Sequence, residues 1–149
     1  EGAWATRKRI QGFREGLEAV GHDPDESPVL IGNYRIDSGY ELTYRLMQHR
    51  RRRPTALLMG NDQMAAGAYI ALARLGLRVP EDVSVVGYDD EPLSADLAPS
   101  LTTVRLPFYE MGRFAAQHAL DATVADMPRL SHLSCPVVPR SSTAPPPGM

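Results

Sequence analysis

The sequence predicts an α/β fold in which a parallel sheet is covered by helices on both faces. Three short runs carry this prediction, because residues 29–31, 56–59 and 83–86 are apolar except for Ser84 and have strand length. Helical patterns of roughly 10 to 15 residues separate the runs, and that alternation is typical of βαβ units. Parallel strands are buried on both faces, which explains why no polar residue alternates along these runs.

The first two helices are predicted from spacing and from end signals. Ile10, Phe13 and Leu17 recur at helical intervals between charged residues, which predicts an amphipathic helix over residues 5–20 that ends at Gly21. Residues 38–41 (SGYE) have the form of a capping box, in which Ser and Glu side chains each satisfy a free backbone amide. We therefore expect a second helix that starts there and ends near residue 49.

Two further helices and one strand complete the predicted elements. Asn61 or Asp62 caps a helix that Gly76 ends. A helix of about 17 residues is expected to start at Phe108, where the apolar spacing again has the helical period. A strand-like run follows at residues 133–138.

Composition excludes several classes of protein. The 149 residues carry a formal net charge of −2, which gives no general attraction to nucleic acid or to anionic membranes. Cys135 is the only cysteine, so no internal disulfide can form, and it falls in the last predicted strand. No apolar run has the length of a membrane helix and no signal segment opens the chain. The arginines at residues 50–53 are expected to form a solvated loop.

Nothing in the sequence indicates catalysis or a cofactor. The four histidines lack the spacing of metal ligands, so no metal site is predicted. Phosphate-binding loops, nucleophile elbows and nucleophile–base pairs are also missing from the sequence. We therefore expect a binding protein without a cofactor rather than an enzyme.

Polar residues follow each of the three predicted strands. These are Asn33 and Tyr34, then Asn61 and Asp62, then Asp89 and Asp90. Ligands of open parallel sheets bind outside the carboxyl ends of the strands. A carboxylate, an amide and an aromatic ring together suit a polyhydroxylated small molecule. The alternative is structural, with Asp62 capping a helix and Asp90 making a turn, and spacing alone favours it for these two residues.

Several motifs together resemble the effector-binding core of LacI/GalR-type transcriptional repressors. They are residues 6–13 (TRKRIQGF), 61–68 (NDQMAAGA), 77–90 (LRVPEDVSVVGYDD), 101–105 (LTTVR) and 140–143 (RSST). They occur in the family's order over nearly the whole chain, and residues 77–90 are the most specific of them. The family's N-terminal helix-turn-helix and most of its first subdomain have no counterpart here, so the chain resembles a fragment.

The resemblance implies a periplasmic-binding-protein-like fold with the effector between two subdomains. Residues 1–105 would be the C-terminal subdomain, and residues 106–130 a helix that crosses to the other subdomain. Residues 131–143 would be the return strand, and residues 144–149 a disordered tail. Carried over position by position, the effector-binding residues would be Arg9, Tyr34, Asn61, Asp89 and Phe108.

The same resemblance implies a function and partners. The chain would sense a sugar-like or nucleobase-like effector in the cytoplasm and control operator binding allosterically, with DNA contacted only through the missing head. A homodimer would form through the helix from Asp62 and the segment around Leu97. The alternative is the solute-binding component of a sugar transporter, which shares the fold. An α/β enzyme comes third.

Overall fold

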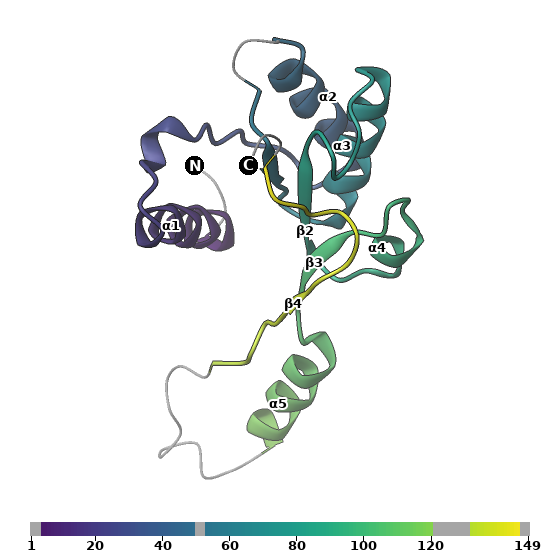
Figure 1. Ribbon diagram of the computed structural model, residues 1–149. Helices are drawn as coiled ribbons and strands as arrows, with labels where there is room; N and C mark the ends of the chain where they lie inside the picture. The colour runs from purple at the N-terminus through teal and green to yellow at the C-terminus, as the bar shows by residue number, and fades with distance from the viewer. Residues whose placement is uncertain (1–3, 50–52, 121–131, 147–149) are drawn as a thin grey trace. The chain divides into compact units, whose positions relative to one another are not determined.

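The computed structural model describes residues 4–49, 53–120 and 132–146. The chain divides into two compact units, Glu1–Asn33 and Tyr34–Met149, which are described in turn (Figure 1). The second unit contains the whole sheet and four of the predicted site residues.

The N-terminal unit consists of helix α1 (Trp4–Ala19) and the 3₁₀ helix η1 (Pro24–Glu26). The helix predicted over residues 5–20 is therefore confirmed. Gly21 follows it with a φ of 79°, a left-handed conformation that glycine adopts without steric cost. Asp23 caps η1, because its carboxylate accepts a hydrogen bond from the Asp25 amide at 2.9 Å.

The strand predicted at residues 29–31 is wrong. The backbone there has no regular secondary structure, and Val29, Leu30 and Ile31 are 36%, 45% and 64% exposed. An apolar run becomes a strand only when a neighbouring strand pairs with its backbone. The described sheet has four strands, and residues 29–31 are not among them.

The sheet of the second unit has the order β1-β2-β3-β4. Its strands are β1 (Ala56–Leu58), β2 (Ser84–Asp89), β3 (Thr102–Arg105) and β4 (Val137–Val138). The first three are parallel to one another, and β4 is antiparallel to β3. The predicted α/β class with a mostly parallel sheet is confirmed.

Two of these strands differ from the sequence prediction. β3 was not predicted, because Thr102 and Thr103 are polar, yet both are buried. The run at residues 133–138 pairs only at β4, and Cys135 is exposed outside any strand. β1 and β2 lie where apolar runs predict them, and β2 continues to Asp89.

Helix α3 (Asp62–Arg74) is capped by Asn61, whose Oδ1 accepts a hydrogen bond from the Met64 amide at 2.9 Å. Asn61 and not Asp62 is therefore the cap, and Gly76 follows the helix with a φ of 69°. The prediction of a capping box at residues 38–41 is wrong. Helix α2 (Ile36–Met47) begins earlier, after Arg35, so those residues lie inside the helix.

The remaining helices are α4 (Pro92–Asp96), which was not predicted, and α5 (Phe108–Leu120). α5 starts at the predicted residue, and the rest of its predicted length lies outside the described residues. Three of the four arginines at residues 50–53 also lie outside the described residues. Arg53 donates a hydrogen bond to the Met47 carbonyl at the end of α2, where the helix dipole favours a cation.

Helices α2 and α3 lie side by side with their backbones in close approach (Figure 1). A Cβ added to Gly39 would overlap the Met64 carbonyl, and one added to Gly67 would overlap the Ile36 carbonyl. Both glycines therefore permit a helix pairing that a larger residue would force apart.

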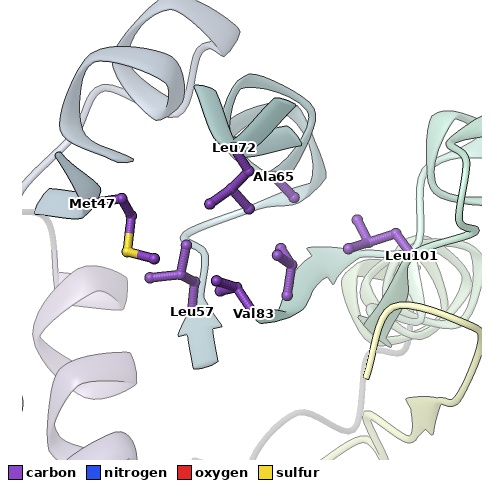
Figure 2. Close-up of a cluster of buried hydrophobic side chains, with 7 residues drawn as sticks. Met47, Leu57, Ala65, Leu72, Val83 and Leu101 are labelled. Atoms are coloured by element: carbon purple, nitrogen blue, oxygen red, sulfur yellow. The ribbon is translucent and has the colours of Figure 1, made fainter. Parts of the chain in front are cut away.

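The core of the second unit lies where these helices meet the sheet. Met47 from α2 and Leu72 from α3 point toward Leu57 of β1 (Figure 2). The cluster of buried residues is completed by Ala65, Val83, Val85 and Leu101. Burial of each Leu, Val or Met side chain contributes about 1.5–3 kcal/mol to the stability of the fold. The cluster therefore fixes α3 against the strands. The packing of α3 on the strands in turn fixes the position of the loops at the strand ends.

Candidate ligand-binding site at the strand ends

Strained backbone marks the end of β2 and the segment before α2. Asp89 has a φ of 111°, Asp90 of 60° and Tyr34 of 65°. Among the described residues these are the non-glycine positions with a positive φ. Such conformations cost roughly 1–3 kcal/mol each and persist only where the surroundings enforce them, commonly at functional sites. Two of the three, Asp89 and Tyr34, are predicted effector-binding residues.

Asp89 and Phe108 line the same open hollow, which has a volume of about 670 Å³. Asp89 ends β2, and Phe108 begins α5 with 59% of its surface exposed. Arg105, Glu91 and Tyr109 also line the hollow. A carboxylate, a guanidinium and two aromatic rings therefore face one space of the size that small-molecule sites have.

Tyr34 and Asn61 form a second pair. The Asn61 side chain donates from Nδ2 to the Tyr34 carbonyl at 3.1 Å while its Oδ1 caps α3. The Tyr34 ring lies against Gly60, where an added Cβ would come within 3.3 Å of the ring. Asn61 thus holds the backbone of Tyr34 in its left-handed conformation, and contact of either residue with an effector stays a prediction.

Tyr34 lines a different hollow, of about 770 Å³, over α2 and α3. Gln63 lines that hollow and Glu91 lines the one with Asp89. Gln63 donates from Nε2 to Glu91 Oε2 at 2.6 Å, so one hydrogen bond connects the two spaces. The structure therefore brings Asp89 together with Phe108 and Tyr34 with Asn61. Arg9 lies on α1 in the N-terminal unit, and its role stays a prediction.

Asp90 is the centre of an ion-pair network, which the sequence did not indicate. Its Oδ1 accepts from Arg140 Nη2 and its Oδ2 from Arg105 Nε, both at 2.6 Å. Burial acts to raise the pKa of this carboxyl, but hydrogen bonds and charge from Arg140 and Arg105 outweigh it and leave the pKa below its usual value. Asp90 therefore shapes the loop through ion pairs, beyond the turn-forming role that spacing favours.

Asp62 is fully buried beneath the same loop. Its Oδ1 accepts from Thr103 Oγ1 at 2.6 Å and its Oδ2 accepts from the Glu91 amide at 2.8 Å. Burial raises the pKa of this carboxyl more than these hydrogen bonds lower it. Asp62 thus ties α3 to β3 and to the loop after β2, which gives it a structural role other than capping.

The described residues add two observations. Among them, no group of three or more histidine, cysteine, aspartate or glutamate side chains could hold a metal ion. None of the helices formed by these residues is both long enough and apolar enough to cross a membrane.

Comparison with known proteins shows the family. The profile of the periplasmic binding protein-like domain matches residues 1–143. The chain is 36% identical over 110 residues to the ribose operon repressor of Escherichia coli strain K12, which covers 74% of this chain and 33% of the repressor. It is 37% identical over 116 residues to the HTH-type transcriptional repressor PurR of Photorhabdus laumondii, covering 78% and 34% of the two chains.

A solved structure gives the same result. A LacI family transcriptional regulator from Enterococcus faecium with bound ribose superposes with a TM-score of 0.81 at 30% identity, covering 92% of this chain and 51% of the regulator. The chain thus spans about a third of the length of the curated relatives that it matches. Both of those relatives are named as repressors. The chain belongs to the periplasmic binding protein-like domain family, in the form found in LacI-type transcriptional regulators.

Proposed function

We propose that this chain is the effector-sensing part of a cytoplasmic LacI-type regulator and that it binds a small sugar-like metabolite. The observation that carries the proposal is Asp89, which ends β2 in a strained conformation and lines a hollow together with Phe108. Backbone conformations of this kind cluster at functional sites, where the surrounding structure enforces them.

The chemistry of the hollow fits a polyhydroxylated guest. A carboxylate can accept hydrogen bonds from two neighbouring hydroxyls, and such charge-assisted bonds are about twice as strong as neutral ones. The Phe108 ring, which is largely exposed, offers an apolar face for the C–H surface of a sugar or for a flat base. Arg105 adds a donor on the same wall.

The remaining predicted ligands belong to the same proposal. Tyr34 would supply an aromatic wall and Asn61 an amide at the start of α3, while the role of Arg9, in the N-terminal unit, stays a prediction. The head that reads DNA would lie outside this chain. An effector that binds one arrangement of the whole regulator more tightly would shift its population, with a coupling of roughly 1–3 kcal/mol to operator binding.

The relatives favour a sugar over other effectors, and a regulator over a transporter component. One is named a ribose operon repressor, and the similar regulator from Enterococcus faecium holds ribose. A nucleobase-like compound stays the second candidate, because the exposed Phe108 ring would also stack on a flat base. We propose no catalytic step, because the relatives described above are named as repressors.

The test is calorimetric titration of the complete gene product with ribose, other pentoses and hexoses, and the common nucleobases. Asp89→Ala should weaken binding of the preferred compound by at least about tenfold, the value of one lost charge-assisted hydrogen bond. Asp82→Ala is the matched control, because Asp82 forms an exposed ion pair with Arg78 outside both hollows. Equal affinity in the Asp89→Ala variant would disprove the site.

A homodimer is part of the proposal. The hollow over α2 and α3 combines exposed apolar side chains, Ile36 and Ile70, with opposite charges at Arg74 and Glu41. Such a surface can pair with its own copy about a two-fold axis. Light scattering should give a dimer, and Ile70→Glu should give a folded monomer because Ile70 is half exposed. A monomeric wild-type protein at high concentration would contradict the dimer alone.

A further inference from the structure

We infer that Asp90 and Arg140 are positioning residues that hold Asp89 in its binding conformation. This inference rests on the proposed function, because Asp89 is the residue being positioned. The two residues would not need to touch the effector. Their effect would pass through the backbone between residues 89 and 90, where two consecutive aspartates have a positive φ.

Asp90 is fixed at both carboxylate oxygens by residues from distant parts of the chain. Arg105 reaches Oδ2 from the end of β3, and Arg140 reaches Oδ1 from the segment after β4. The Asp90 side chain is only 9% exposed. Charge-assisted pairs of this geometry, with little competing water, hold a side chain in one orientation.

Arg140 is itself held in place. Its Nη1 donates to the Leu101 carbonyl at 2.7 Å and to Ser94 Oγ at 3.0 Å, and its own amide donates to Thr102 Oγ1 at 2.9 Å. The Arg140 side chain is 19% exposed, against 56% for Arg105. Arg140 is therefore the rigid support of the pair. It does not line the hollow of Asp89, whereas Arg105 and Asp90 do.

The next residue is fixed from the opposite side. The Glu91 amide donates to the buried carboxylate of Asp62, and the Glu91 carbonyl accepts from Ser94 Oγ at 2.7 Å. On the other flank, Asp89 is still in register with Arg105 in the sheet. The chain thus has to pass from a fixed strand to a fixed loop within two residues.

This short span accounts for the strain at Asp89. An unusual backbone conformation persists when the contacts around it determine the path of the chain. Asp90 supplies those contacts, and its left-handed φ of 60° is one that aspartate tolerates better than most residues. Without the pair to Arg140, Asp90 keeps only the bonds from Arg105 and Ser94. We expect residues 89 and 90 then to return toward negative φ, which would turn the Asp89 carboxylate away from the hollow.

The experiment uses Asp90→Asn and Arg140→Met in the complete gene product. Asparagine keeps the tolerance for left-handed backbone but removes the charge, and Met keeps the length of the arginine stem. Asp82→Asn is the matched control, because it breaks the exposed pair with Arg78 by the same change of residue. If Arg140→Met does not fold, Arg140→Lys and Asp90→Asn still decide the inference.

The first readout needs no ligand. The three-bond coupling between the amide and Cα protons of Asp89 reports its φ, and it is small near 111° and large in extended strands. We expect the coupling to increase in Asp90→Asn and Arg140→Met and to stay unchanged in Asp82→Asn. An unchanged coupling in both site variants would overturn the inference.

The second readout is a double-mutant cycle on binding, with ribose and the other compounds as probes. Asp90→Asn should weaken binding about tenfold in the wild-type background and have no further effect in the Asp89→Ala background. Equal effects in the two backgrounds would overturn the inference and leave the proposed function standing. If the wild-type protein binds none of the probes, the proposed function fails, and the coupling of Asp89 alone decides whether Asp90 and Arg140 hold its backbone.

Discussion

Gly87 lies directly against the carboxylate of Asp62, at a point of β2 where a side chain would overlap the Asp62 Oδ1 atom. Gly87 is in register with Thr103, which donates its hydroxyl to the same oxygen. The glycine therefore leaves the space in which the contact between Asp62 and Thr103 forms.

Gly87→Ala should destabilise the protein by about 1–3 kcal/mol, the usual cost of inserting a methyl group into a packed interior. The added Cβ would also meet a Leu101 methyl at 2.7 Å. Gly16→Ala is the control, because a Cβ on Gly16 meets nothing within 4 Å and alanine favours a helix. Urea unfolding measures both, and equal stabilities of the two variants would contradict the prediction.

Asn61→Ala should cost about 1–2 kcal/mol of unfolding free energy, because the cap of α3 and the bond to the Tyr34 carbonyl are both lost. Asn61→Asp keeps the cap and loses only the donor to Tyr34. We expect its stability to fall between those of the alanine variant and the wild type. An aspartate variant as unstable as the alanine variant would show that the cap contributes little.

Asp62 gives a pH dependence with a definite sign. Its pKa in the folded protein lies above the ordinary 3.8, so the folded state binds more protons in the interval above 3.8. The contribution of Asp62 to stability should therefore fall as pH rises from 3.8 through the raised pKa. Below 3.8 both states are protonated and the contribution is constant.

The measurement compares wild type with Asp62→Asn, which cannot titrate at this position. The difference in unfolding free energy, wild type minus variant, should decrease as the pH is raised above 3.8 in a series of urea unfolding experiments. Other carboxyl groups are common to both proteins and cancel in the difference. A difference that grows with pH would mean that the folded pKa of Asp62 is lowered instead.

Asp89→Gly should separate stability from binding. Glycine adopts a φ of 111° without the steric cost that aspartate bears, so the variant should gain about 1 kcal/mol in stability. Asp89→Ala is the matched control, because it also removes the carboxylate but keeps the strain. Both variants should lose effector affinity in calorimetry, and only the glycine variant should unfold at a higher temperature than the wild type. Equal melting temperatures of the two variants would contradict the strain at Asp89.

The elements that could be predicted from the sequence are those with a local sequence signal, either an apolar run or a residue that starts or ends a helix. β1 and β2 are apolar runs, and α3 has both an asparagine cap and a glycine stop. The run at residues 29–31 has the same composition and forms no strand, because composition does not specify a pairing partner. The motif at residues 38–41 matches a capping box in letters only, since α2 has already begun at Ile36.

β3 shows why the rest could not be predicted. Its two threonines are polar, yet their hydroxyls are satisfied in the interior by residues far away in sequence, Asp62 for Thr103 and the Arg140 amide for Thr102. The site has the same property. Asp89 is predicted from its place after a strand together with the family resemblance. Arg140, about fifty residues from Asp90, carries no local sign that it would hold that carboxylate.

The antiparallel pairing of β3 with β4 places the segment that leads into α5 beside the segment that leads to Arg140, since the Arg105 amide at the end of β3 donates a hydrogen bond to the Pro136 carbonyl at 2.9 Å. Arg105 belongs to the segment that leads into α5, and Arg140 follows β4. Both arginines form ion pairs with Asp90. A displacement of one segment relative to the other would act on the Asp90 carboxylate as well as on the hydrogen bond between Arg105 and Pro136. A force on α5 would therefore be transmitted through Arg105 to Asp90, the neighbour of Asp89.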